Sequence, residues 1–444
     1  MGTSVDLLVA GGPLLTMDSA GSFFSDGAVA ISHGSIVAVG HREAVAAAVA
    51  ADEMIDARGK AILPGFVNSH SHAGMVLLRG LAETYPLQRW LTGCVWPVMK
   101  FAGPEETYAG VRLACLEMIR AGITTFTDMW RDLPATAQAV EESGLRARLA
   151  FNMRDFPDPA LLDSEWECGF AALSTFHPTP LISYGLSPHS LYACSTDLLQ
   201  RCAETVTDLR CHLQIHLAET EIEVNECQSA YGCTPVERLD EIGLLGPRSL
   251  LAHGIWFSET DCIRAAKAGA VVAHNITSNL KLASGLLPLL RFQSAGLTVA
   301  LGTDSAASNN VLDIFREMKH AALLQRAFHH DATLWPALSV LEAATRNGAS
   351  ALGLADQIGS LETGKRADLI LINLDRPHLA IGRPRNAEEL AGKVVFSATA
   401  ADVDTTIVEG RVLMLHREVI SLETKSVCEK ARIASRRLLD RAQL

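Results

Sequence analysis

The sequence predicts an α/β fold, a (β/α)8 barrel with a small β-sandwich domain formed from both termini. Eight short apolar runs alternate with helical stretches in the middle of the chain, and strand-rich segments with Gly turns lie at both ends. Alternating strands and helices indicate a parallel sheet, and eight such units close a barrel. We predict the first part of the sandwich at residues 1–59, the barrel at 60–365, and the rest of the sandwich with a closing helix at 366–444.

The elements follow in a regular order. Strand-like segments of the first flank are VDLLVAGGPLLTMD, GAVAISHGSIVAVG and EMIDARG. The barrel strands are predicted at AILPGFVNSH, ITTFTDM, ARLAFNM, LISYGLSPHS, CHLQIHLAE, SLLAHGI, AVVAHN and LTVALGTD. Residues 104–122 illustrate the helices between them, because apolar residues recur at helical spacing and Gly122 ends the pattern. The second flank contributes GSLETGKRADLILINLD and TTIVEGRVLMLHREVI, and residues 423–444 are predicted to form a closing helix.

Composition limits the kinds of partner. A formal net charge of −12 leaves no basic stripe for nucleic acid or an anionic membrane. No apolar run reaches the roughly 18–20 residues needed to span a bilayer, and the first residues lack the features of a leader. The 10 cysteines include no C-x-x-C pair, so no zinc knuckle or disulfide framework is indicated. We expect a cytoplasmic homo-oligomer with a small-molecule substrate.

The stretch LPGFVNSHSHAGM places His70 and His72 at the end of the first predicted barrel strand. In an extended strand, side chains at i and i+2 point to the same face, with Cα atoms roughly 6.5–7 Å apart. Two imidazoles at this spacing can bind one metal ion. However, H-x-H is a short motif, and two unrelated histidines in a turn would look the same.

The other strand ends support a site. Six of the 15 histidines fall at these ends, and the carboxyl ends of barrel strands converge on one mouth. Polar residues at the ends are His70, His72, Asp128, Arg154, His189, His216, Glu219, His253, His274, Asn275 and Asp304. A set of this size is typical of a metal or catalytic site.

Four of these residues suit one divalent metal ion. Imidazole nitrogens and one carboxylate are ligands for Zn²⁺ or Fe²⁺, and a remaining position for water defines a catalytic metal site. We predict His70, His72, His216 and Asp304 as ligands, with zinc as the first choice and iron as the alternative. Asp304 could also cap the next helix, or accept a proton from the bound water.

Two further residues suit proton transfer. Glu219 lies three residues after His216 and could take a proton from a water whose pKa a metal has lowered, although it also fits the first turn of a helix. His253, at the sixth strand end, could donate to an oxygen or ring atom that develops negative charge. Glu219, His253 and Asp304 are therefore the predicted catalytic residues.

At this point the sequence resembles the amidohydrolase superfamily, specifically the branch of metal-dependent aminohydrolases that includes S-adenosylhomocysteine and 5'-methylthioadenosine deaminases. The resemblance covers essentially the whole chain. It is carried by LPGFVNSHSH, LLRGLAE, AGITTFTDM, SPHSLY, HLAETEIEV, HNITSNLKLASG, LGTDSAASNN and IGSLETGKRADLILINLD. SNLKLASG and TDSAASNN are specific to this branch, whereas H-x-H is shared by the whole superfamily.

The resemblance implies the same ligand and catalytic residues and adds residues for substrate binding. Glu83 matches a glutamate that binds ribose hydroxyls, and His189 matches a histidine that contacts substrate. Trp90 lies in the same apolar loop as Glu83 and could cover a bound ring. Arg154 is the nearest candidate for an arginine that some relatives carry. The implied reaction is hydrolytic deamination of an amino-substituted purine ring, with a 5'-modified adenosine as the preferred substrate.

The sequence departs from the pattern of the branch beside the predicted pocket. Ile276 follows Asn275 where H-N-P is common, and Ser305 follows the aspartate where Gly is common. Gly254 and Trp256 take the places of a Cys and a His. These differences leave the chemistry intact and put the identity of the substrate in doubt.

Three alternatives differ in what they require. Two-metal hydrolases of cyclic amides need a carboxylated lysine at the fourth strand end, and no lysine occurs between Lys100 and Lys267. A hydrolase that displaces chloride or an amine from an s-triazine, or from another N-heterocycle, would use nearly the same site. A non-catalytic scaffold would be expected to have lost metal ligands, and none is missing here.

Overall fold

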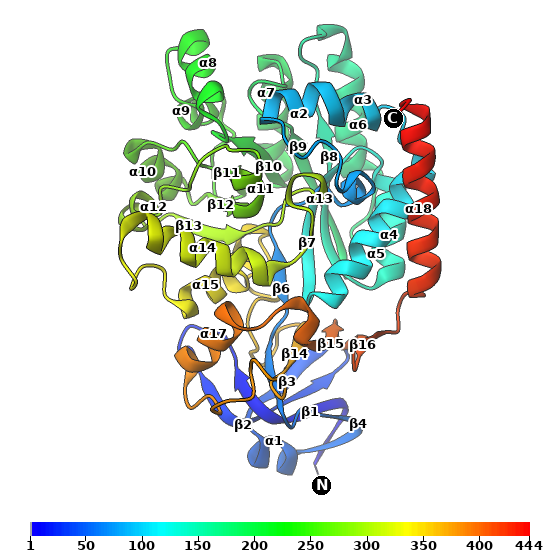
Figure 1. Ribbon diagram of the computed structural model, residues 1–444, viewed down its shortest axis with the longest axis vertical. Coiled ribbons are helices and arrows are strands. Elements are labelled where there is room, and N and C mark those ends of the chain that lie inside the picture. Colours follow the sequence, from blue (N-terminus) through cyan, green and yellow to red (C-terminus); the bar gives the residue numbers. More distant parts are fainter. Residues whose placement is uncertain (1) are drawn as a thin grey trace.

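The computed structural model describes residues 2–444, which form two regions stacked along the long axis of the molecule (Figure 1). The larger region is a parallel barrel whose eight strands neighbour one another in the order in which they occur in the chain. The barrel strands are β6 (Phe66–Asn68), β7 (Ile123–Trp130), β8 (Arg146–Met153), β9 (Ile182–Pro188), β10 (His212–Leu217), β11 (Ser249–His253), β12 (Val271–His274) and β13 (Thr298–Leu301). Each of the eight predicted runs contributes one strand to the barrel.

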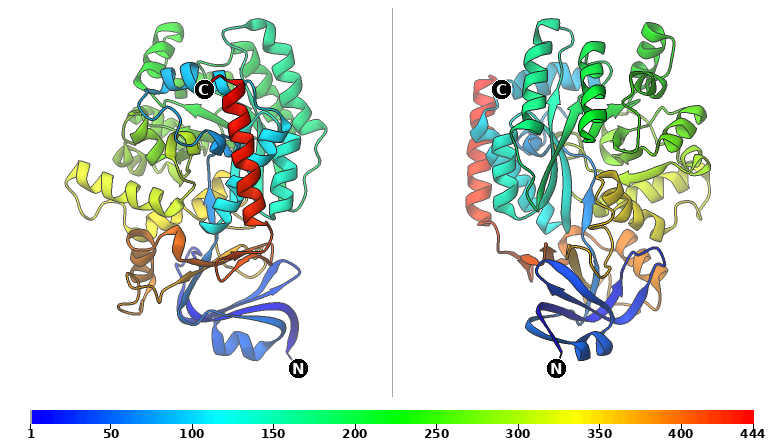
Figure 2. Two further views of the ribbon diagram at one scale, coloured as in Figure 1. Left: turned by 45° about the vertical axis from the view of Figure 1, so that its right-hand side comes forward. Right: turned by 180° about the vertical axis from the view of Figure 1, so that it is seen from behind.

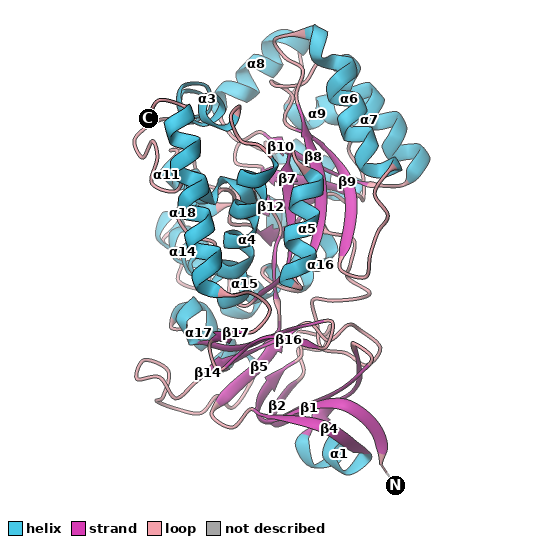
Figure 3. Ribbon diagram, turned by 90° about the vertical axis from the view of Figure 1, so that its right-hand side faces the viewer, coloured by secondary structure: helices cyan, strands magenta, loops and turns pink. Residues whose placement is uncertain are grey.

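Helices surround the barrel strands (Figure 3). Their ends follow local sequence signals, as α5 (Leu133–Ser143) shows: the Asp132 carboxylate caps its first turn, and Gly144 ends it with a φ of +80°. The other helices of this region are α4 (Pro104–Arg120), α6 (Leu162–Ser174), α7 (Thr196–Leu209), α8 (Glu221–Tyr231), α9 (Pro235–Ile242), α10 (Glu259–Ala268), α11 (Ile276–Lys281), α12 (Leu289–Ala295), α13 (Ala306–Asn309), α14 (Ile314–His329), α15 (Ala337–Ala343) and α16 (Arg346–Ala351).

The barrel closes between its first and last strands, next to the predicted site. The Ser69 N–H donates to the Leu301 carbonyl at 2.9 Å, and the Asp304 N–H donates to the His70 carbonyl at 2.9 Å. Closure therefore fixes the backbone on both sides of His70 and places Asp304 beside it.

The second region is a nine-stranded sheet built from both ends of the chain (Figure 2). Its order is β17-β16-β15-β14-β5-β1-β2-β3, with β4 paired to β1. The strands are β1 (Thr3–Leu15), β2 (Phe23–Ser32), β3 (Ser35–His41), β4 (Val49–Asp56), β5 (Lys60–Pro64), β14 (Leu369–Asn373), β15 (Val403–Val408), β16 (Arg411–Leu415) and β17 (Glu418–Val419). The predicted fold class, a (β/α)8 barrel with a small β-sandwich domain formed from both termini, is confirmed, and the strands of the small domain belong to this one hydrogen-bonded sheet.

The first predicted barrel run is divided between the two regions. β5 pairs with β14 in the nine-stranded sheet, and the barrel strand β6 begins only at Phe66. The division occurs at Gly65, where the Thr124 side chain packs so closely that an added Cβ would lie 2.1 Å from its hydroxyl oxygen. The close packing at this glycine joins the sheet to the barrel.

Shorter elements complete the fold. α1 (Arg42–Ala48) and α17 (Ala387–Phe396) belong to the terminal region, and η4 (Ala400–Asp402) precedes β15. α18 (Thr424–Arg441) runs back beside α4 on the barrel wall (Figure 1), where the Ser435 hydroxyl donates to the Leu77 carbonyl at 2.7 Å. Near the mouth lie η1 (Ala73–Leu78), α2 (Leu87–Trp90), η2 (Leu91–Val95), α3 (Trp96–Met99) and η3 (Pro159–Leu161). None of the helices within residues 2–444 has the length and apolar character needed to cross a bilayer.

Candidate active site

A pocket of about 430 Å³ opens at the carboxyl ends of the barrel strands. Its polar floor includes residues from five strand ends, His72, His189, His216, His253 and Asp304, with Glu219 beside them. Its walls are largely apolar and aromatic, with Trp90, Trp96 and Trp130 among the lining residues. A pocket of this size, apolar with a few convergent polar groups, is typical of a site for a small molecule.

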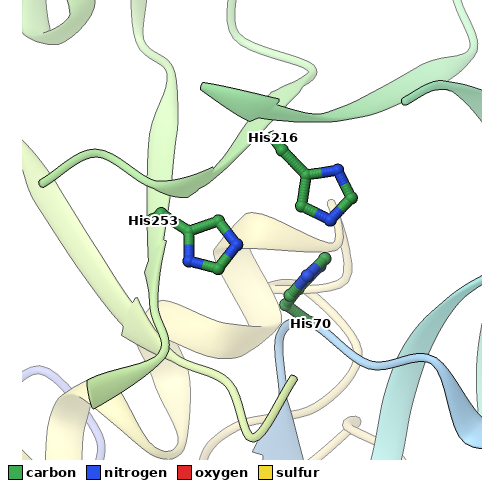
Figure 4. Close-up of side chains that lie close together, drawn as sticks. All are labelled: His70, His216 and His253. Atoms are coloured by element: carbon green, nitrogen blue, oxygen red, sulfur yellow. The ribbon is translucent and has the colours of Figure 1, made fainter. Parts of the chain in front are cut away.

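Three histidines point toward one another beneath this pocket. His70, His216 and His253 converge from three different strands (Figure 4), and each offers a ring nitrogen within 4.8 Å of the others. His72 joins them, because its Nε2 lies 3.2 Å from the Nε2 of His216. His70 and His72 lie just past the end of β6, on either side of Ser71, which forms an isolated parallel bridge with Asp304.

Backbone carbonyls fix the tautomers of two of these rings. The His72 Nδ1 contacts the Met129 carbonyl at 3.1 Å, and the His216 Nδ1 contacts the His189 carbonyl at 2.7 Å. A carbonyl can only accept, so each Nδ1 carries the proton and each neutral ring presents a bare Nε2. Burial also lowers the pKa of His216 well below its ordinary value, which favours the neutral ring.

Asp304 completes this group of donors. Its Oδ1 lies 3.5 Å from the Nε2 atoms of both His70 and His72. The Ser278 hydroxyl donates to Oδ2 at 2.5 Å, and the Ser305 N–H donates to Oδ1 at 2.7 Å. Asp304 has a φ of +58°, in the left-handed region that Asp adopts more readily than most residues with a Cβ. The cap of the following helix is Ser305, so the capping role considered for Asp304 falls to its neighbour.

The donor set suits a divalent metal ion. Two bare imidazole nitrogens 3.2 Å apart repel each other unless a cation lies between them, and neither ring nitrogen of the buried His70 has a hydrogen-bond partner among the described residues. Imidazole nitrogens with one carboxylate are a common ligand set for such ions. The hydrogen bonds that hold the His72 and His216 rings are of the kind that orients metal-bound histidines.

Glu219 and His253 lie together at the edge of this group. The His253 Nε2 is 3.7 Å from the Glu219 Oε2, and the His253 Nδ1 contacts the Asn279 Oδ1 at 2.8 Å. Both side chains are buried. Burial, with the nearby Asp304 carboxylate, raises the pKa of Glu219 well above its usual range. A carboxyl group with a raised pKa can both take and give a proton near neutral pH.

The residues predicted to bind substrate are only partly brought together. His189, Trp90 and Arg154 line the pocket, and the Arg154 guanidinium lies over the Trp96 ring at 4.4 Å from its centroid. Glu83 is not among the lining residues. Its carboxylate instead contacts the Lys281 Nζ at 3.0 Å and accepts from the Asn310 side chain at 3.0 Å. The predicted contact of Glu83 with ribose stays a prediction.

Several residues that shape the site were not singled out from the sequence. Ser278 and Asn279 hold Asp304 and His253, and they lie in the branch-specific motif SNLKLASG. Trp96 follows Trp90 in the segment after the first barrel strand, and both line the pocket. Two tryptophans so close together in the sequence could have indicated an aromatic pocket wall. The Tyr192 hydroxyl is buried in the pocket wall without a hydrogen-bond partner among the described residues, and it lies in SPHSLY.

Comparisons with known proteins agree with this geometry. The model of the "Amidohydrolase family" matches residues 61–413. A 5-methylthioadenosine/S-adenosylhomocysteine deaminase of Desulforudis audaxviator is 42% identical over 424 residues, which are 95% of this chain and 96% of the relative. A 5'-deoxyadenosine deaminase of Methanothermobacter thermautotrophicus is 42% identical over 390 residues, or 87% of this chain and 90% of the relative.

A solved structure shows the same fold over its whole length. The crystal structure of an adenosine deaminase from Xanthomonas campestris with bound zinc superimposes with a TM-score of 0.91 and is 32% identical, covering 99% of each chain. The matched family model spans both the barrel and strands of the small domain. The chain therefore belongs to the amidohydrolase family.

Proposed function

We propose that the protein is a metal-dependent hydrolytic deaminase whose substrate is a 5'-modified adenosine of the methylthioadenosine or S-adenosylhomocysteine type. The observation that carries this proposal is the convergence of His70, His72, His216 and Asp304 beside Glu219 at the floor of one pocket. The relatives support the substrate class, because the compounds in their names are all adenosines altered at the 5' position.

In this proposal, His70, His72, His216 and Asp304 would hold one divalent ion, and zinc is our choice because a similar structure contains it. A bound ion lowers the pKa of a water ligand toward neutrality and acts as a Lewis acid. The second hydrogen bonds of these residues, from Ser278 to Asp304 and to the two backbone carbonyls, keep their donor atoms directed inward.

Glu219 is the proposed proton carrier. It takes a proton from the water that attacks the amine-bearing ring carbon and delivers it to the adjacent ring nitrogen. Glu219, directly or through Asp304, then takes the proton of the newly added hydroxyl group and delivers it to the departing amine, so that the C–N bond breaks and ammonia and a ring carbonyl remain. The burial of Glu219 supports this role, because bulk water does not compete for its protons.

His253 is proposed to hold the oxygen of the attacking water. Asn279 accepts from its Nδ1, and its Nε2 faces Glu219 at 3.7 Å. A proton shared between Glu219 and this Nε2 provides a hydrogen-bond donor where negative charge develops.

The aromatic wall is proposed to cover the purine. Trp90 lies in the wall, and His189 lies beside the metal group, where it would contact the substrate. Arg154 lies farther out, over Trp96, where it would meet the 5' substituent. We also propose that Glu83 contacts the ribose hydroxyls. To do so, its carboxylate must exchange one of its present partners, Lys281 or Asn310, for the sugar.

The substrate is tested by measuring ammonia release from methylthioadenosine, 5'-deoxyadenosine, adenine and an aminotriazine, with zinc-loaded protein. We expect the two nucleosides to have the highest kcat/KM. Glu83→Ala should reduce kcat/KM for the nucleosides and leave adenine nearly unchanged, whereas Glu105→Ala, at a carboxylate with an 83% exposed side chain, should change neither.

Other outcomes would replace the proposal. If Glu83→Ala reduced kcat/KM equally for adenine and for the nucleosides, the proposed contact of Glu83 with ribose would be wrong. Turnover of the triazine without ammonia release from any adenosine would favour the s-triazine hydrolase, because the aromatic walls suit either flat ring. Protein that binds no metal and turns over no substrate would favour the non-catalytic scaffold.

A further inference from the structure

Glu223 is a buried carboxylate beside the active site that the proposed reaction does not use. It lies in the first turn of α8, and the residue is only 2% exposed. Each of its two carboxylate oxygens accepts one backbone N–H: Oε1 accepts from Ala218 and Oε2 from Glu219, both at 2.9 Å. Glu223 therefore binds the backbone of the residue that is proposed to carry the proton.

This arrangement differs from the usual role of a glutamate in the first turn of a helix. In a capping box, the glutamate at the third helical position accepts from the N–H of the N-cap residue. α9 has this form, because Glu237 accepts from the N–H of its N-cap residue Thr234 at 3.0 Å. Glu223 occupies the same position in α8 but reaches past the N-cap residue Thr220, to the two residues before it. Its hydrogen bonds thus fix the loop before the helix, which carries Glu219.

The loop between β10 and α8 is held on both sides. Ala218 has a φ of +49°, in the left-handed region that few residues with a Cβ adopt. The Leu217 carbonyl accepts from the Gly254 N–H at 3.1 Å. The Ala218 carbonyl accepts from the Trp256 N–H at 3.0 Å. The carbonyl groups of this loop are therefore bound to the loop after β11, and two of its N–H groups are bound by Glu223.

The position of this loop determines where the Glu219 carboxylate lies. Its Oε2 is 3.7 Å from the His253 Nε2, and both side chains line the pocket. A group that transfers a proton must lie within hydrogen-bond reach of the reacting atom. A displacement of about 1 Å, even when it is caused far from the reacting atoms, can reduce the rate roughly 10²-fold. A residue that fixes the backbone of Glu219 can therefore affect the rate without contacting the substrate.

We propose that Glu223 is a positioning residue for the deamination, whose carboxylate holds the backbone N–H groups of Ala218 and Glu219 so that the Glu219 side chain faces His253 and the substrate. Glu223 is not among the residues that line the pocket, so it acts through Glu219. The inference rests on the proposed function of Glu219 as the proton carrier. It requires that Glu223 contributes to kcat only while Glu219 is present.

The test is a double-mutant cycle with the full-length, zinc-loaded protein and methylthioadenosine. Glu223→Gln keeps the size of the side chain but replaces one acceptor oxygen with an NH₂ group, which cannot accept the N–H that it faces. We expect kcat to fall roughly 10–100-fold, with KM and zinc content nearly unchanged. The double variant Glu219→Gln/Glu223→Gln should be no slower than Glu219→Gln alone, because effects of residues that act as a unit do not add.

Glu237→Gln is the matched control. It makes the same change at the same helical position of α9, where the carboxylate accepts from the N–H of the N-cap residue Thr234. Its kcat should equal that of the wild type. If Glu223→Gln does not fold, Glu223→Asp takes its place in the cycle. Its side chain keeps both acceptor oxygens but is one methylene shorter, so it should show the same selective loss of kcat.

The outcomes separate this inference from the proposed function. Wild-type kcat in a folded Glu223→Gln or Glu223→Asp variant, or losses that multiply in the double variant, would overturn the positioning role and leave Glu219 as the proton carrier. A fully active Glu219→Gln variant would overturn the proton carrier, and the positioning role with it. A loss of kcat in Glu223→Gln that is absent from the Glu219→Gln background supports both.

Discussion

The mouth and the base of the barrel both contain buried polar atoms without protein partners, but the atoms have opposite character. At the mouth, the unpaired atoms are imidazole nitrogens with lone pairs, beside the Asp304 carboxylate, and a cation can bind to them. At the base, they are two N–H groups of Arg148 and the Nδ1 of His212, on side chains that are only partly buried. A metal ion would satisfy the atoms at the mouth, whereas a single water molecule is large enough to satisfy those at the base.

Both ends of the barrel contain residues other than glycine with a positive φ. Asp304 and His253 at the mouth have positive φ values of +58° and +78°. Arg148 lies inside the regular strand β8, paired with β7 and β9. Strain of this kind costs roughly 1–3 kcal/mol per residue and persists where function requires a fixed geometry. At the base, Arg210 has a φ of +50° where α7 ends, so the feature that distinguishes the mouth is its group of convergent donor atoms.

Removal of the metal should have the largest effect. We expect a chelator to abolish ammonia release, and zinc to restore it, because the attacking water loses its activation. His70→Ala should lower metal content and activity together. Metal analysis of the pure, active protein should give one ion per chain, and a value of two, or none, would contradict the assignment of ligands.

Glu219→Gln should separate proton transfer from metal binding. General acid–base assistance is worth roughly 10²–10⁴-fold, so we expect kcat to fall by at least about that factor while metal content stays unchanged. Glu221→Gln, two residues further along and exposed, is the matched control and should retain activity. An active Glu219→Gln variant would show that another group carries the proton.

Arg146→Met should affect the base of the barrel and leave the chemistry of the mouth unchanged. The variant leaves Asp368 without its buried partner, and a broken buried ion pair costs about 3–5 kcal/mol. We expect a lower free energy of unfolding by this amount in denaturant titrations, with kcat unchanged below the unfolding transition. Loss of less than about 1 kcal/mol, the usual value of a surface pair, would mean that the pair is solvated.

Ser278→Ala should have the smallest effect at the mouth. It removes one hydrogen bond to the Asp304 Oδ2 and leaves every proposed ligand in place. Loss of such an orienting group typically reduces metal affinity about 10–100-fold. A zinc titration with a competing chelator measures this change, and kcat at saturating zinc should decrease much less. Unchanged affinity would show that the remaining donors, the Ser305 N–H and the Ser308 hydroxyl, are sufficient to orient the carboxylate.

Much of this arrangement follows from sequence patterns. The apolar runs predicted the barrel strands because parallel barrel strands are buried on both faces, as β7 is along all eight residues. His70, His72, His216 and Asp304 were predicted because strand ends converge in a barrel. Their proximity in the structure supports the proposed ligand set without testing metal binding.

Other features depend on packing that no local pattern describes. The division between β5 and β6 at Gly65 depends on the position of Thr124, which is far along the chain. In the sequence, Ser278 and Asn279 look like ordinary helical residues. Only the fold shows that Asn279 contacts His253 and that Ser278 contacts Asp304. The carboxylates of Asp368 and Glu409 pair with Arg146 and not with Arg148, and the sequence of β8 does not show which of its two arginines is paired.

Hydrolytic deamination is tested most directly by the reaction of methylthioadenosine in water enriched in ¹⁸O, with the product analysed by mass spectrometry and the ammonia counted. The proposal predicts one heavy oxygen at the former amine-bearing carbon of the purine and one ammonia per product molecule, with the 5' group and the ribose intact. Product without the label, cleavage at the sugar, or no ammonia from any adenosine would contradict it.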